Sequence, residues 1–284
     1  MKGMTMVTTG TFAAMIFTLI ICFAVPIGLV IYLYVKKRIS ILAVAIGALT
    51  FFLMQIMIRI PALQVFSETA IYFRLTAYPF WFALFLGFTA ALFEEGGRWL
   101  AFRFLMKGRL EHKNALAMGI GHGGIEAMAL VGMIYLNYVV IAFMINNGSF
   151  QSSIVPVVGE SAANQILAVL TGANSTAFLL AGVERGLTLI IQIAFSMMVY
   201  FSVRYHRAVY FWGAMLAHTV LDLLAVYLNQ MGVSLYAIES VVVVFAGFGL
   251  WFLIRSERLD AHYSQPQSQN VIEVISGTEQ DSIM

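Results

Sequence analysis

The chain has 284 residues, of which 61% are hydrophobic and 11% charged, whereas soluble domains average about 45–50% and about 25%. This composition excludes an ordinary soluble domain and indicates an integral membrane protein, whose surroundings include a lipid bilayer. The net charge of +2 is too small to suggest a nucleic-acid partner, and the single cysteine, Cys22, excludes a disulfide framework and a cysteine metal site.

Seven apolar runs are long enough to cross a hydrocarbon core of about 30 Å, which takes about 20 helical residues. The sequence therefore predicts an all-α fold, a polytopic membrane helix bundle of about seven transmembrane helices within residues 1–255. The runs lie near residues 11–35, 39–60, 77–106, 115–146, 176–203, 208–230 and 234–254. The first run is expected to be an anchor, because it is longer than a signal peptide and no small-x-small cleavage pattern follows it.

Cationic residues gather after alternate runs, and short cytoplasmic loops retain Lys and Arg. This pattern predicts an N-terminus outside the membrane and a C-terminus in the cytoplasm. The residues assigned to the cytoplasmic side are Lys36, Lys37, Arg38, Arg103, Lys107, Arg109, Lys113, Arg204, Arg207, Arg255 and Arg258. Lys2, Arg59 and Arg74 are assigned to the outer side, and Arg98 and Arg185 lie within runs.

Two segments lie outside the runs. Residues 147–175 form a long, nearly uncharged outer loop, for which a plain connector is favoured over a substrate lid. Within this loop, residues 160–171 can form a short helix at the membrane interface. The tail, residues 256–284, is rich in Gln, Ser and charge, and is expected to be a disordered cytoplasmic segment.

The third run contains Glu94, Glu95 and Arg98. Each ionised side chain at the centre of a spanning helix costs about 2.5–3.5 kcal/mol, so such residues are candidates for a functional site. Arg98 follows the two carboxylates by four and three residues and can reach either along one helix face. If Arg98 only neutralised one Glu, the presence of the second Glu within the run would remain unexplained. Two adjacent carboxylates with one cation cannot both ionise cheaply, so one is expected to hold a proton and to suit proton transfer.

The fourth, fifth and sixth runs add further polar residues. His122 lies among four glycines and four residues before Glu126; glycines alone predict close helix packing, but around a His and a Glu they favour a site. Asp222 follows His218 by one turn and can accept its ring proton. The adjacent residues Glu184 and Arg185 are expected to point in different directions near the outer face, where a structural role and closure of the site are both open.

Unpaired and facing lipid, the seven intramembrane charges would cost about 20 kcal/mol, so they are expected to converge on an interior cavity. A wet cavity with two Glu, two His and an Arg suits hydrolysis, in which a Glu takes a proton from water and a His stabilises the oxyanion. The sequence has no His-Glu-x-x-His zinc helix, no Gly-x-Ser near a helical His and no pair of intramembrane Asp residues. The zinc-helix, serine and aspartyl routes are therefore disfavoured.

Together the motifs resemble the YhfC family of intramembrane proteases, which belongs to the wider group of type II CAAX prenyl endopeptidases, bacteriocin-processing enzymes and PrsW site-1 proteases. The resemblance covers residues 10–255. Its motifs are Glu94-Glu95-x-x-Arg98, Gly-His122-Gly-Gly-x-Glu126, Glu184-Arg185 and His218-x-x-x-Asp222. It implies a multi-pass protein of a bacterial cell membrane that cleaves a membrane-anchored protein or peptide within or near the bilayer.

The resemblance also implies roles for individual residues. Glu94 falls on the water-activating base, supported by Glu95 and Arg98. The two histidines, His122 and His218, fall on the water-positioning and oxyanion groups, with Glu126 and Asp222 beside them in the site and Glu184 and Arg185 as supporting residues. Two departures, Asp222 in the place of an Asn and an Arg one residue early, argue against prenylated CAAX tails as the substrate.

The cofactor is either none or zinc. A catalytic zinc site could use His122, His218 and Glu94, with a water in the open position. Members of the family have been described both as metalloproteases and as metal-free glutamic proteases. The metal-free reading is favoured here, because Arg98 beside the Glu pair disfavours a second cation.

Two other functions are open from the residues alone. Buried Glu, His and Asp chains also relay protons, so a proton-coupled transporter is possible, and inverted repeats or broken helices would favour it. A non-catalytic membrane scaffold is the other possibility, and the presence of the Glu pair counts against it. The sequence specifies neither the substrate nor the oligomeric state.

Overall fold

The computed structural model describes residues 6–172 and 174–265, and within these ranges every regular element is a helix. Four of the elements, labelled η, are π-helical segments continuous with α-helices. In chain order the elements are α1 (Thr9–Leu19), η1 (Ile20–Ala24), α2 (Val25–Lys37), α3 (Ile41–Phe51), η2 (Phe52–Arg59), α4 (Ile60–Ser67), α5 (Ala70–Thr76), α6 (Pro79–Leu100), η3 (Ala101–Leu105), α7 (His112–Glu126), η4 (Ala127–Gly132), α8 (Met133–Asn147), α9 (Phe150–Ser153), α10 (Val155–Val158), α11 (Glu160–Gly172), α12 (Ser175–Arg204), α13 (Ala208–Gln230) and α14 (Leu235–Ser264).

Six continuous helical stretches are long and apolar enough to cross a membrane, and a seventh arises where α5 and the helix Pro79–Leu105 meet at a bend of 117°. The six are Thr9–Lys37, Ile41–Ser67, His112–Asn147, Ser175–Arg204, Ala208–Gln230 and Leu235–Ser264. These findings confirm the predicted all-α bundle of about seven membrane-spanning helices.

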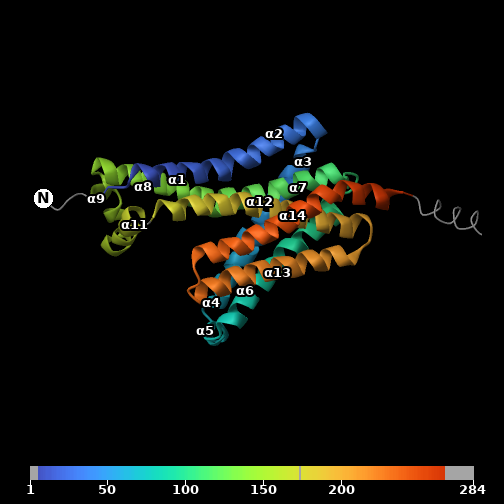
Figure 1. The fold of residues 1–284 in the computed structure, drawn as a ribbon. Helices are drawn as coiled ribbons and strands as arrows, with labels where there is room; N and C mark the ends of the chain where they lie inside the picture. The colour runs from blue at the N-terminus through green and yellow to red at the C-terminus, as the bar shows by residue number, and fades with distance from the viewer. Residues whose placement is uncertain (1–5, 173, 266–284) are drawn as a thin grey trace, which may run out of the picture.

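The spans alternate in direction, so the bundle has two ends, which Figure 1 shows at left and right. The N-terminal end carries the start of α1 and the segment from α9 to α11. The basic end carries the turns after α2, η3 and α12 together with the C-terminal part of α14. All the Lys and Arg residues that the sequence assigns to the cytoplasm lie at or near the basic end.

The sequence places Arg59 on the outer side, at the end of the run near residues 39–60, and the structure shows that this residue is buried within a helix. The candidate span that begins at Ile41 continues past Arg59 to Ser67, and the exposed fraction of Arg59 is 8%. Its Nη2 donates to the carbonyl oxygen of Leu86 at 2.8 Å, and its Nε donates to Thr89 Oγ1 at 3.3 Å. The guanidinium therefore joins η2 to α6 inside the bundle.

Both segments outside the runs contain helix. A helix is present where one was predicted in the outer loop, as α11. α14 continues to Ser264, so the first residues of the predicted disordered tail are helical, and Asp260 there accepts hydrogen bonds from Tyr200 and Tyr205, each at 2.7 Å. The rest of the predicted tail, residues 266–284, lies outside the described residues.

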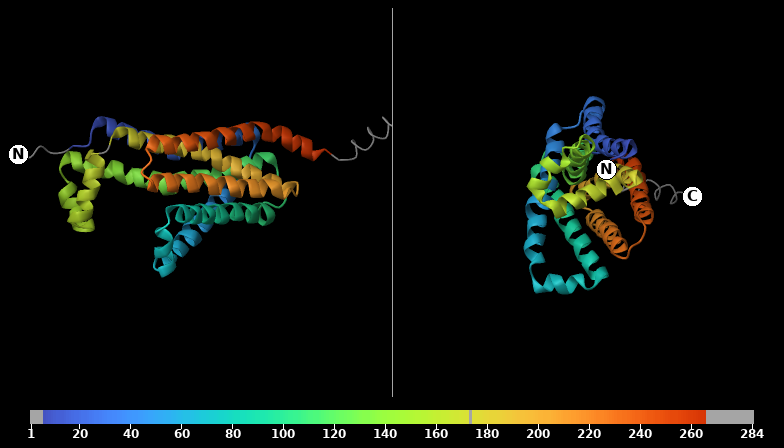
Figure 2. Two further views of the ribbon diagram at one scale, coloured as in Figure 1. Left: turned by 60° about the horizontal axis from the view of Figure 1, so that its bottom comes forward. Right: turned by 90° about the vertical axis from the view of Figure 1, so that its left-hand side faces the viewer.

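Helix α12 is the central element. In its most apolar stretch 72% of the residues are buried, compared with 33% or less in the other five continuous spans. Figure 2 shows the other helices arranged around it, with α4 and α5 set off on the side away from α1. A side chain on α12 can therefore contact several helices at once.

Close backbone contact fixes α7 against α3. A Cβ atom at Gly47 would overlap the carbonyl oxygen of Met118, and one at Gly121 would overlap the carbonyl oxygen of Val44. Only glycine permits this approach. The glycines around His122 therefore do pack helices, and the same packing places His122 edge-on to Phe51, with 5.2 Å between ring centroids.

Candidate active site

The predicted site residues of the third, fourth and sixth runs meet inside the bundle, on α6, α7 and α13, around the central helix α12. Those that are buried are Glu94, Glu95, Arg98, His122, Glu126 and His218, with exposed fractions from 0 to 8%. The cost of placing such charges in a membrane is met by pairing, because each of them contacts at least one other polar side chain.

The two adjacent carboxylates have different surroundings. Glu95 is fully buried, and its Oε1 accepts hydrogen bonds from Arg98 Nη1 and, at 2.7 Å, from His218 Nδ1. Glu94 lines a cavity and makes its contacts through Oε2, which lies 3.1 Å from His122 Nε2 and 3.6 Å from Arg98 Nη2. Among the described residues, Oε1 of Glu94 has no hydrogen-bond partner, so this oxygen is available to a molecule in the cavity.

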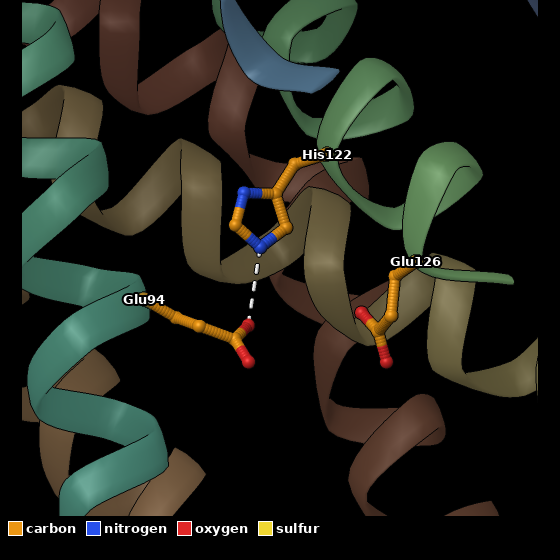
Figure 3. Close-up of side chains that lie close together, drawn as sticks. All are labelled: Glu94, His122 and Glu126. Carbon is orange, nitrogen blue, oxygen red and sulfur yellow. Dashed lines mark hydrogen bonds and ion pairs between the residues drawn. The ribbon is translucent and has the colours of Figure 1, made fainter. Parts of the chain in front are cut away.

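Glu126 lies one turn beyond His122 on α7, on the same side as the carboxylate of Glu94. Figure 3 shows the three side chains converging from α6 and α7, with the hydrogen bond between His122 and Glu94 as a dashed line. One ligand atom from each lies within 4.8 Å of the other two.

The ring of His218 is held by Glu95 rather than by Asp222. The predicted partner, Asp222, lies 3.7 Å from Nε2, which is too far for a hydrogen bond. The i, i+4 spacing shows which groups can meet on one helix, but the Glu95 carboxylate approaches Nδ1 from α6. Phe195 stacks on the ring at 19° and 5.2 Å between centroids, so the imidazole is fixed by packing as well.

Glu184 and Arg185 do not point in different directions, because the long Arg185 side chain folds back to pair with Glu184 through Nη2. Its Nη1 lies 3.3 Å from Oε1 of Glu126. The pair is therefore connected to the buried cluster through Glu126.

Gln192 is the most important site residue that the sequence analysis missed. It is 4% exposed on α12, and its Oε1 accepts a hydrogen bond from Arg98. That bond orients the amide so that Nε2 donates to Oε2 of Glu126 at 2.6 Å and to Oε2 of Glu94 at 3.4 Å. An available signal was its position two turns after Arg185, on the same helix face in an apolar run.

A cavity of about 230 Å³ lies beside these groups. Its polar lining includes Gln55 from η2, a second residue that was missed. The full lining is Gln55, Glu94, Glu126, Leu130, Glu184, Arg185, Thr188, Ile191, Gln192, Phe195, His218, Leu221, Asp222, Ala225 and Val242. Carboxylates, an imidazole and two amides thus line one cavity.

The donor set fits a divalent cation. Catalytic zinc sites use three protein ligands drawn from His, Asp, Glu and Cys, and leave one position open. The residues predicted from the sequence for such a site are His122, His218 and Glu94. The group whose ligand atoms the structure brings within 4.8 Å of one another contains Glu94, His122 and Glu126, and does not include His218.

Comparison with known proteins gives two matches. The family model described as YhfC intramembrane metalloprotease matches residues 21–243. A Bacillus subtilis (strain 168) protein described as "Uncharacterized membrane protein YhfC" is 31% identical over 245 residues, which cover 84% of this chain and 93% of that protein. No solved structure matches the chain.

Proposed function

The chain belongs to the YhfC intramembrane metalloprotease family, and from this premise we propose that it hydrolyses a peptide bond in a membrane-embedded or membrane-proximal segment of another protein. The observation that carries the proposal is the placement of Glu94. One carboxylate oxygen is held by His122, and the other faces a cavity that can admit both water and a peptide.

Glu94 is the base in this proposal. Its free oxygen, Oε1, takes a proton from a water molecule, and the water oxygen forms a bond to the carbonyl carbon of the substrate. His122 and Gln192 hold Oε2, so the carboxylate does not rotate away from the cavity. Such positioned general bases contribute about 10²–10⁴-fold to rates.

His218 stabilises the oxyanion that forms on the carbonyl oxygen. Its Nδ1 is committed to Glu95, and the ring lines the cavity. Only a protonated imidazole donates from both nitrogens, so His218 acts here as the imidazolium. When the carbon–nitrogen bond breaks, the leaving amine takes the proton that Glu94 accepted, which restores the carboxylate.

A divalent cation, if bound, would be held by Glu94, His122 and Glu126. Such an ion supplies Lewis-acid activation of water and of the scissile carbonyl. Gln192 bridges the two carboxylates of this set and would keep them oriented toward a shared ligand.

Substitution Glu94→Gln tests the assignment, because it keeps the shape of the side chain and removes the base. We expect the purified variant to bind but not cleave a substrate, so that an uncut membrane protein is captured with it. The matched control is Glu239→Gln, which alters a buried carboxylate on α14 that does not line the cavity. Undiminished cleavage by Glu94→Gln would sink the proposal.

A further inference from the structure

The cavity extends farther toward one end of the bundle than toward the other. On α12, which runs from the N-terminal end to the basic end, the cavity is lined from Glu184 to Phe195. Gln192, which contacts Glu94, marks the level of the reacting groups. With a rise of 1.5 Å per residue, the cavity reaches about 12 Å from that level toward the N-terminal end but only about 4.5 Å toward the basic end.

Two helices that run in the opposite direction show the same offset. On α13 the lining extends from His218 to Ala225, about 10 Å toward the N-terminal end. On α7 and η4 it extends from Glu126 to Leu130. In the part of the chain that the structure describes, neither helix contributes a lining residue on the basic side of His218 or of Glu126.

Packed side chains close the site on the basic side. Helices α6 to η3, α7 and α12 each place large residues between the reacting groups and that end, all with exposed fractions of 0 or 1%. These residues are Phe102, Met106, Met118, Tyr200 and Phe201. Protein interiors are packed as densely as organic crystals, so this layer leaves no path for a peptide.

Exposure rises in the other direction. The side chains of Glu184 and Asp222, nearer the N-terminal end, are 33% and 35% exposed, whereas that of Glu94 is 5% exposed and that of His122 is fully buried. Carboxylates at membrane depth face water-filled cavities rather than lipid. The cavity is therefore open to water at its N-terminal side.

We infer that the peptide segment to be cleaved enters the site from the N-terminal end of the bundle, opposite the basic loops. In the orientation predicted from the charges, this end faces the outside of the cell. The substrates are therefore membrane proteins that are cut in the outer half of the bilayer or just outside it. The identity of the entering molecule as a peptide substrate rests on the proposed peptidase function. The side on which the cavity is open does not depend on that function.

Thiol labelling tests the side of access without needing catalysis. In a Cys22→Ala background, Ala225→Cys and Thr188→Cys each place a thiol in the cavity wall, at positions to which no catalytic role is assigned. Cys22 is buried, so its replacement removes a background site rather than an exposed one. A positively charged, membrane-impermeant methanethiosulfonate is then added to intact cells and, separately, to inverted membrane vesicles.

Two exposed marker positions show which end of the bundle the reagent reaches in each preparation. Gln151→Cys marks the N-terminal end and Arg109→Cys marks the basic end. We expect both cavity thiols to react in the preparation that labels Gln151→Cys, and at least tenfold more slowly in the one that labels Arg109→Cys. Labelling together with Arg109→Cys, or labelling in neither preparation, would overturn the inference. Failure of the peptidase proposal would show itself differently, as undiminished cleavage by Glu94→Gln with the labelling pattern unchanged.

Discussion

Nδ1 of His218 lies 2.7 Å from Oε1 of Glu95, so a fully buried carboxylate on α6 holds the imidazole that α13 presents to the cavity. The same oxygen accepts a hydrogen bond from Arg98. Glu95 therefore supports two other charged groups and does not line the cavity, whereas its neighbour Glu94 does. The two acids of the pair should respond differently to substitution.

Glu95→Gln is expected to destabilise the protein far more than Glu94→Gln. Removing the charge of Glu95 leaves Arg98 buried without its main counterion, and breaking a buried ion pair costs about 3–5 kcal/mol. Arg98 keeps that counterion when Glu94 is replaced. Thermal unfolding of both variants in the same detergent measures the difference, and equal losses of Tm would contradict the division of roles.

Gln192→Leu is expected to lower kcat by at least tenfold with little change in KM. The substitution removes the amide that orients Glu94 and Glu126 but retains most of the volume. The assay uses the substrate captured by the Glu94→Gln variant. Gln230→Leu, at the exposed end of α13, is the matched control. A purely structural role for Gln192 would appear as lost Tm without a selective change in kcat.

Glu126→Gln is expected to weaken zinc binding. As a direct ligand, Glu126 should contribute more than the residues that only contact ligands, whose substitution typically lowers metal affinity by about 10–100-fold. Elemental analysis and titration of metal-stripped protein with zinc measure the effect, with Glu239→Gln as control. Unchanged affinity in Glu126→Gln would remove this residue from the donor set.

Gly121→Ala is expected to destabilise the bundle, because the added Cβ would overlap the carbonyl oxygen of Val44 and backbone cannot move aside cheaply. Overpacking of this kind typically costs about 1–3 kcal/mol. Gly96→Ala is the control, since a Cβ there meets nothing within 4 Å and alanine favours helix by up to about 1 kcal/mol. A lower Tm for the control than for Gly121→Ala would be the contrary result.

Much of the fold and part of the site could be predicted because membranes penalise charge so strongly. The apolar runs mark the spans, and the charges inside them mark Glu94, Glu95, Arg98 and Glu126 as residues that must meet. An uncharged amide carries a smaller penalty, so Gln192 did not stand out within its apolar run. The helical end of α14 was missed because its polar residues suggested disorder, whereas Asp260 is bound by tyrosines of the neighbouring segment.

Partner choice was the harder part of the site. Spacing along a helix shows which groups can reach one another, and for Arg98 this was enough, because it contacts both Glu94 and Glu95. It was not enough for His218, whose nearer carboxylate comes from another helix. The extension of the second span from residue 60 to Ser67 was not predicted, because hydrophobicity defines the end of a helix only to within a few residues.

The pairing of Arg98 with Glu95 inside a single helix has a consequence for biosynthesis. When α6 leaves the ribosome and enters the bilayer, α12 and α13 have not yet been made, so neither Gln192 nor His218 can receive its charges. Because the guanidinium and the carboxylate are three residues apart, α6 carries its own counterion into the membrane. Glu184 and Arg185 do the same for α12. The protein can thus be inserted one helix at a time, with the remaining contacts added as later helices arrive.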